Sequence, residues 1–168
     1  MTAATFQSTV NVSLSFGVIG EIIVGGPQRV EPLTLDSVGG TIGFGFTKSN
    51  TTNVATMGGT PTPGASVFAG ILVNPKVYAA FGTSNPIDPT LSLPGYTQAE
   101  FMTMGTIVVA LTGAANIGDI VQMNTTTGAL SALQPGSTVT AGNVFIPNCV
   151  VYRYPSTGAG LAAIRITE

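Results

Sequence analysis

Apolar and polar residues alternate along much of this chain. The clearest case is the segment 10–18, in which every second residue is valine, leucine or phenylalanine and the residues between them are small or polar. Because successive side chains of a strand point to opposite faces, this period of two predicts a strand with one buried face. Shorter apolar or alternating runs predict further strands at 21–24, 30–35, 42–46, 67–73, 76–81, 101–111, 144–154 and 161–167.

Glycine and proline mark the ends of many predicted strands. Residues 25–27 read Gly-Gly-Pro, and residues 58–64 combine three glycines with two prolines, so both segments are predicted turns. The segments 118–123 and 128–133 flank a polar Asn-Thr-Thr-Thr stretch. This arrangement predicts a β-hairpin, in which Gly128 supplies a positive φ near the turn.

Some residues are expected to interrupt or compete with the strands. Pro32 cannot donate a ladder hydrogen bond, so its strand is expected to lie at an edge or to be bulged, and Pro147 is expected to break its own strand. Glycines that alternate with aromatic residues at 42–46 suggest that another part of the chain packs closely there. A short helix over 98–104 is an alternative to a strand, although the glycine and threonines that follow weaken it.

About ten short strands separated by turns predict an all-β fold, an antiparallel β-sandwich or jelly-roll-like domain with long loops rich in proline and glycine. No linker or fixed-period repeat divides the chain. We therefore assign residues 10–168 to a single β domain and residues 1–9 to an extended N-terminal arm. The longest irregular segment, 82–98, contains three prolines, and loops of this length in a compact domain are often functional.

Charge is scarce in this sequence. Its 168 residues include five Lys or Arg, seven Asp or Glu and no His, which gives a net charge of −2. Five dispersed cations cannot form the basic patch that nucleic-acid binding requires. The lack of His excludes Ser-His-Asp, Cys-His and His-ligated zinc chemistry. Hydrophobic residues make up 44% of the chain, which argues against intrinsic disorder. We therefore expect a protein that works through contact surfaces and is not an enzyme.

The remaining reactive groups support the same expectation. The acids have no dyad or ligand spacing and are expected at solvated strand ends and turns, although two distant carboxylates acting as in a glycosidase are an alternative. The glycine-rich segment 39–45 lacks the Gly-Lys-Ser/Thr of a phosphate loop. Asp119 and Asn124 offer too few oxygens for a metal ion, so no metal or other cofactor is expected. Cys149 lies in an apolar strand without a base and is expected to be a buried, inert thiol.

The start of the chain gives an expectation about location. Its first nine residues contain neither the basic nor the apolar region of a secretory signal. The longest uninterrupted apolar run, 107–111, is far shorter than the ~20 residues of a membrane-spanning helix. We therefore expect a protein that is neither secreted nor inserted in a membrane.

Apolar residues in the arm and in the loops 58–64 and 82–98 are candidate contacts with a partner, because little charge surrounds them. An ordinary surface loop and a frayed terminus are the alternative. The residues predicted as contacts are Thr5, Phe6, Gln7, Thr60, Pro61, Pro63, Pro86, Ile87, Pro89, Leu91, Leu93 and Tyr96.

Five segments that occur in order resemble the structural cement, or decoration, proteins of tailed bacteriophage heads. The first reads Thr-Ile-Gly-Phe-Gly-Phe-Thr-Lys, and the last reads Gly-Ala-Gly-Leu-Ala-Ala-Ile-Arg-Ile-Thr. The resemblance extends from about residue 17 to the C-terminus. The five segments are residues 41–48, 67–76, 101–109, 118–130 and 158–167.

This resemblance implies a β-rich protein that binds the outer surface of an assembled phage capsid. It would lie across the seams between major capsid protein subunits and help the mature head to withstand the pressure of packaged DNA. It implies no catalytic residues and a location in the virion after synthesis in the bacterial cytoplasm. Self-association into a homo-oligomer is also expected, because symmetric seams favour symmetric oligomers.

Two other functions are compatible with the residues. One is another virion component, such as the base of a head fibre or a part of the tail. The other is a carbohydrate-binding β-sandwich, although the chain contains no Trp. The candidate sugar-stacking residues in that case are Tyr78, Tyr96, Tyr152 and Tyr154.

Overall fold

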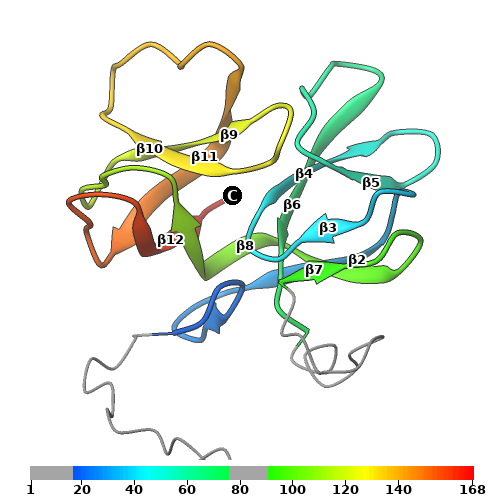
Figure 1. Ribbon diagram of the computed structural model, residues 1–168, viewed down its shortest axis with the longest axis horizontal. Helices are drawn as coiled ribbons and strands as arrows, with labels where there is room; N and C mark the ends of the chain where they lie inside the picture. The colour runs from blue at the N-terminus through cyan, green and yellow to red at the C-terminus, as the bar shows by residue number, and fades with distance from the viewer. Residues whose placement is uncertain (1–16, 76–90) are drawn as a thin grey trace, which may run out of the picture.

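The computed structural model describes residues 17–75 and 91–168 (Figure 1). Within these residues it contains twelve strands, and it has no helix long and apolar enough to cross a membrane. The all-β prediction is therefore confirmed. The strands are β1 (Ile22–Ile23), β2 (Arg29–Leu35), β3 (Gly40–Thr41), β4 (Gly45–Ser49), β5 (Val54–Met57), β6 (Ser66–Leu72), β7 (Ser92–Leu93), β8 (Gln98–Leu111), β9 (Ile120–Asn124), β10 (Leu130–Leu133), β11 (Asn143–Arg153) and β12 (Gly160–Ile166).

Strand β8, 14 residues long, belongs to two closed sets of strands. Pairing in the order β8–β12–β11–β9–β10 returns to β8, because Leu130 of β10 pairs with Leu111. Pairing in the order β8–β2–β5–β4–β6 also returns to β8, because β6 pairs with Phe101 and Met102. We call the first set the C-terminal ring and the second the N-terminal ring. Figure 1 shows them as two lobes on either side of β8.

The two halves of β8 serve different rings. Residues up to Met104 pair with β2, and residues from Gly105 onward pair with β12. Gly105 lies at this changeover with a φ of 129°, a backbone conformation that glycine adopts far more readily than other residues. Glycine therefore lets one continuous strand turn from one ring into the other.

Each ring packs its own apolar core, and β8 contributes to both. In the N-terminal ring, Phe101 of β8 meets Phe46 edge to face, with ring centroids 5.0 Å apart. In the C-terminal ring, Ile107, Val109 and Leu111 of β8 are fully or almost fully buried. Other members of the two cores include Leu33, Leu35, Ala69, Leu72 and Leu93 in the first, and Val121, Met123, Ile146, Val151, Ala162 and Ile164 in the second.

The rings also meet away from β8. The Gly45 N–H of β4 donates to the Gly128 carbonyl at 2.9 Å, and the Gly59 N–H donates to the Thr125 carbonyl at 2.7 Å. A Cβ on Gly45 would collide with the Met123 sulfur. The close approach predicted from the glycines at 42–46 is therefore confirmed, and the two rings are fixed to each other at two places.

Several local predictions are confirmed. Strands β9 and β10 form the predicted antiparallel hairpin, and Gly128 has a φ of 74°. The strand that contains Pro32 has a register shift between Arg29 and Val30, as expected for a bulged strand. At Pro32 itself β2 pairs only with β8, since β5 reaches no further than Thr34.

Other local predictions are wrong. The segment 42–46 is not one strand, because a turn at Ile42 and Gly43 separates β3 from β4. The helix considered for 98–104 is absent, because buried and exposed residues alternate there with the period of a strand that pairs with β2. Pro147 does not end its strand: β11 runs through it, and the register with β9 shifts between Phe145 and Val150 instead.

The finer fold prediction, an antiparallel sandwich or jelly roll, is not confirmed. The pairings close into two rings, and two of them are parallel, namely β2 with β5 and β8 with β10. The arm 1–9, most of the strand predicted at 10–18, the strand predicted at 76–81 and most of the loop 82–98 lie outside the described residues.

Gly70 of β6 gives a stability test of this architecture. Its φ is 129°, and a Cβ there would lie 2.6 Å from the Met102 carbonyl oxygen of β8. Gly70→Ala should therefore lower the free energy of unfolding by about 1–3 kcal/mol, measured by urea denaturation. Gly113→Ala is the matched control, because no atom lies within 4 Å of the added Cβ, and its effect should be within about 0.5 kcal/mol. Equal stability of the two variants would contradict close pairing of β6 with β8.

Candidate contact surfaces

The acidic residues of the described structure make local structural contacts. Glu31 and Glu168 form ion pairs with Lys48 and Arg29, at 2.5 and 2.9 Å. Asp119, expected at a solvated turn, is buried at its turn and accepts a backbone N–H at 2.8 Å. No group of three or more possible metal ligands of the His, Cys, Asp or Glu type occurs within residues 17–75 and 91–168.

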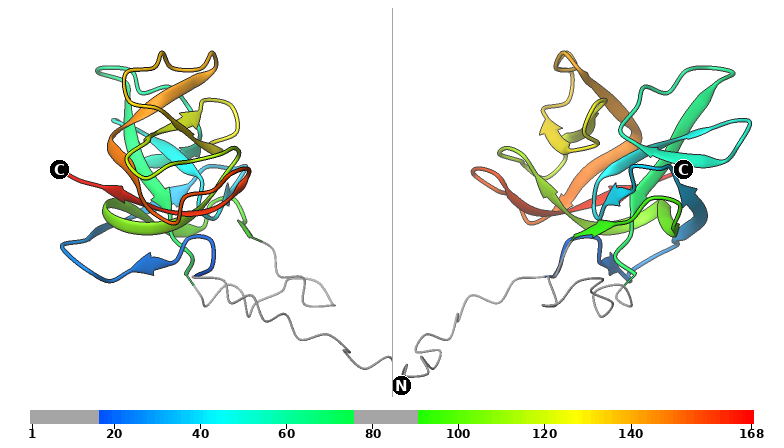
Figure 2. Two further views of the ribbon diagram at one scale, coloured as in Figure 1. Left: turned by 90° about the vertical axis from the view of Figure 1, so that its left-hand side faces the viewer. Right: turned by 45° about the vertical axis from the view of Figure 1, so that its right-hand side comes forward.

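The two segments outside the described structure join it at one place. The Asn74 backbone N–H donates to the Gly20 carbonyl at 2.9 Å, and the Asn74 side chain donates to the Ile19 carbonyl at 3.2 Å. Ile42 packs so closely on Gly20 that a Cβ on Gly20 would not fit. The Ile42 N–H donates to the Leu91 carbonyl at 2.7 Å. We call these five residues the junction. The views in Figure 2 place the start of the described chain and both ends of its gap on the same side of the molecule.

A second surface lies beside the short sheet of β3 and β7, where two turns pack together. The Tyr96 N–H donates to the Asp36 carbonyl at 3.0 Å, and neither Gly39 nor Gly95 has room for a Cβ against the other turn. Each turn carries one large apolar side chain at the surface: Val38 is 78% exposed and Tyr96 is 77% exposed. We call this pair the Val38–Tyr96 tip.

The backbone conformation at the tip indicates that the exposed Tyr96 ring does not stabilise the fold. Tyr96 has a φ of 59°, in the left-handed region where a residue other than glycine, asparagine or aspartate is uncommon. Such a conformation costs on the order of 1 kcal/mol, and an exposed side chain recovers little of it by packing. An exposed apolar side chain held in this way is a candidate contact with another protein.

The loop 58–64 forms a third surface at the opposite end of β6 from the junction. Strand β6 begins at Ser66, next to this loop, and ends at Leu72, next to Asn74. Seven residues of strand span roughly 20 Å, so the two surfaces are well separated. The loop is closed by its own hydrogen bonds, in which Thr62 and Ser66 exchange backbone bonds of 3.0 and 2.9 Å.

The structure separates the predicted contact residues into groups. Leu91 and Tyr96 are exposed near the junction and at the tip, whereas Leu93 between them is only 4% exposed and packs in the core of the N-terminal ring. In the loop 58–64, Thr60 and Pro63 are exposed and Pro61 is partly buried. Thr5, Phe6, Gln7, Pro86, Ile87 and Pro89 lie outside the described residues.

The sequence analysis missed Val38. The signal was present, because an apolar residue lies inside an Asp-Ser-Val-Gly-Gly turn that offers it no strand face to pack on. That its turn packs against the turn of Tyr96 could not be predicted, since the pairing of β2 with β8 and of β3 with β7 brings the two turns together across a long stretch of chain.

Cys149 has the environment that its sequence context predicted. It is a free thiol, it is 1% exposed, and it belongs to the core of the C-terminal ring. Burial raises the pKa of this thiol far above its ordinary value, because the thiolate would lose its hydration. The group is therefore neutral and inert in the folded protein.

Comparisons with known proteins were made over the whole chain. A family model described as "Structural cement protein (E217 gp24/Pam3 gp6)" matches residues 6–167. A chain of the solved structure "The capsid of Myoviridae Phage XM1" is 19% identical and has a TM-score of 0.68, with 98% of this chain and 99% of that chain covered. At this identity the structural likeness shows a shared fold. No curated protein sequence matches significantly.

Tyr96→Asn should leave the free energy of unfolding unchanged or raise it slightly, because asparagine tolerates a positive φ and little packing is lost. Urea denaturation measures the effect. Leu93→Ala, in the same part of the chain but buried, should lower the free energy by about 2–5 kcal/mol. A large loss of stability in Tyr96→Asn would mean that the ring supports the fold.

Cys149 should react with iodoacetamide at pH 8 roughly a thousandfold more slowly in the native protein than in urea, because modification requires unfolding that costs several kcal/mol. Mass spectrometry of timed samples gives both rates. Rapid modification of the native protein would show that the thiol is open to solvent.

Proposed function

The chain belongs to the family of phage structural cement proteins, and from this membership we propose that it binds the outer surface of a bacteriophage capsid and stabilises the mature head across the seams between major capsid protein subunits. The observation that carries the proposal is the family match, which extends from residue 6 to residue 167. A capsid-associated structural role also agrees with the scarcity of charge and the exposed apolar residues of the described structure.

The positions of the candidate surfaces support a bridging role. The junction and the loop 58–64 lie at opposite ends of β6, within a fold whose two rings are held together by β8 and by Gly45. A rigid body with separated contacts can engage two neighbouring capsid subunits at once. The second contact then forms at a high effective concentration, so weak individual contacts add up to firm attachment.

Stabilisation of the head follows from mass action. A protein that binds only the expanded arrangement of subunits lowers the free energy of that arrangement relative to every other one. Apolar contacts suit this task, because salt screens charges and has little effect on the burial of apolar surface. Symmetry-related seams would also favour binding as a homo-oligomer.

The test is cosedimentation with empty heads assembled without this protein, in expanded and unexpanded forms. Saturable binding to expanded heads alone is the expected result. The double variant Val38→Asn/Tyr96→Asn should weaken that binding about tenfold or more, since an exposed tyrosine with an apolar neighbour is a typical interface anchor.

The matched control is Ile117→Asn. This residue is also a largely exposed aliphatic side chain on a turn, but it belongs to the connection between β8 and β9. It should bind as the unmodified protein does. Absence of binding to either form of the head would overturn the proposed function. If the double variant and Ile117→Asn lose the same amount of head binding, the Val38–Tyr96 tip is not part of the interface.

A further inference from the structure

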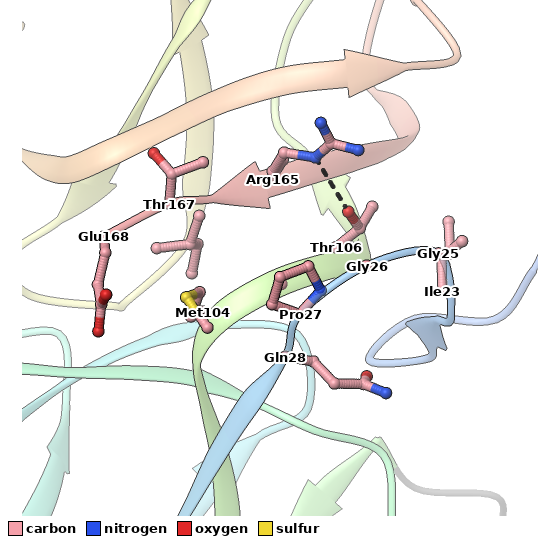
Figure 3. Close-up of a pocket in the computed structure, with 12 residues that line it drawn as sticks. Ile23, Gly25, Gly26, Pro27, Gln28, Met104, Thr106, Arg165, Thr167 and Glu168 are labelled. Carbon is pink, nitrogen blue, oxygen red and sulfur yellow. Dashed lines mark hydrogen bonds between the residues drawn. The ribbon is translucent and has the colours of Figure 1, made fainter.

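A cavity of about 350 Å³ opens between the β1–β2 turn and strands β8 and β12 (Figure 3). Ile23 and Pro27 form one wall, Met104 contributes to the floor, and the last residues from Arg165 onward form the other wall. This volume is at the lower end of the range for ligand sites and accommodates a few side chains of a peptide. We call it the Arg165 groove.

Glycine keeps the groove open. Gly25 and Gly26 at the rim and Gly105 in the floor present backbone without side chains. Gly25 and Gly26 are exposed, and an added Cβ on either would meet no atom within 4 Å. Backbone exposed in this way can be approached closely by the main chain of another polypeptide.

Arg165 is held at the edge of the groove in a fixed orientation. Its Nε donates to the Thr106 hydroxyl at 3.4 Å (Figure 3). Its guanidinium carbon lies 3.5 Å from the centre of the Tyr152 ring. Arg153 lies over the same ring at 4.9 Å and donates to the Tyr152 hydroxyl. The hydrogen bond from Arg153 and the nearby positive charge of Arg165 lower the pKa of this partly buried tyrosine.

The charge of these two arginines is not neutralised within the described residues. Four cations occur there, and Arg29 and Lys48 pair with Glu168 and Glu31. Arg153 and Arg165 form no ion pair with any carboxylate of residues 17–75 and 91–168. Two unneutralised arginines on one ring, in a chain with a net charge of −2, form a local positive site that attracts a carboxylate.

We propose that the Arg165 groove binds an extended acidic segment of the partner protein, with an apolar side chain in the cavity and a carboxylate on the free edge of the Arg165 guanidinium. The partner is a capsid subunit if the proposed function holds, on which this identification rests. A second copy of this chain fits less well, because, of its seven acidic residues, Glu31 and Glu168 are engaged in ion pairs and Asp119 is buried.

The test uses Arg165→Gln in the full-length protein with expanded empty heads. Binding should weaken about tenfold at low salt, and its dependence on salt should decrease. Lys48→Gln is the matched control: it also removes one positive charge, but that charge is paired with Glu31 and lies outside the groove, so binding should change less than about threefold. Arg153→Gln, which is exposed, repeats the test if Arg165→Gln unfolds.

A cross-link identifies the occupant. Arg165→Lys places an amine where the guanidinium lies, and a water-soluble carbodiimide joins that amine as an amide to a carboxylate in contact with it. A cross-linked peptide from an acidic segment of the capsid protein, found by mass spectrometry, is the expected product. A cross-link to a second copy of this chain would overturn the proposed occupant. If the heads are bound, no cross-link forms and Arg165→Gln binds as tightly as the unmodified protein, the groove is not a binding site, while the proposed function stands. Failure of the unmodified protein to bind heads would overturn both this inference and the proposed function.

Discussion

The architecture depends on one strand that belongs to two closed rings. Strand β8 supplies backbone partners to β12 and β10 on one side of Gly105 and to β2 and β6 on the other, so loss of β8 would open both rings. Closure also removes most free strand edges, which limits unspecific pairing with other chains. The result is a small body whose surface loops hold fixed positions relative to one another, and such preorganisation lowers the entropy that binding costs.

Sequence alone was sufficient for features decided by neighbouring residues. The apolar run at 161–167 predicted β12, because the residue types of one segment favour a strand. The polar turn with Gly128 predicted the β9–β10 hairpin, because its strands pair only a few residues apart. Ring closure could not be predicted, since it depends on Leu130 meeting Leu111 and on β6 meeting β8 across long stretches of chain. The prediction of one strand over 42–46 was wrong for a related reason. Gly43 has a φ of 78° and lies too close to Ile19 for a Cβ, and the local period reveals neither feature.

The same distinction applies to the candidate surfaces. Proline and glycine correctly predicted the loop 58–64 as a turn, and the scarcity of charge predicted contact surfaces made of apolar side chains. Leu91 and Leu93 share a period, yet one is exposed and the other is buried, because β7 contains only two residues and Leu91 precedes it. The Arg165 groove carried no local signal, since β11, β12 and the β1–β2 turn meet only in the folded chain.

Under the proposed function, the surfaces would differ in what they contribute to attachment. Burying an apolar tip such as Val38 and Tyr96 would contribute much binding free energy, but it would constrain the orientation of the bound protein only weakly. A guanidinium held over the Tyr152 ring would accept a carboxylate from a narrow range of directions, so it would fix orientation even where it adds little free energy. On a shell of repeated subunits, adhesion without orientation would let a small protein attach in several registers. Arg153 and Arg165 meet no carboxylate of residues 17–75 and 91–168 and lie over one ring, so under the proposed function they would help to select a single register.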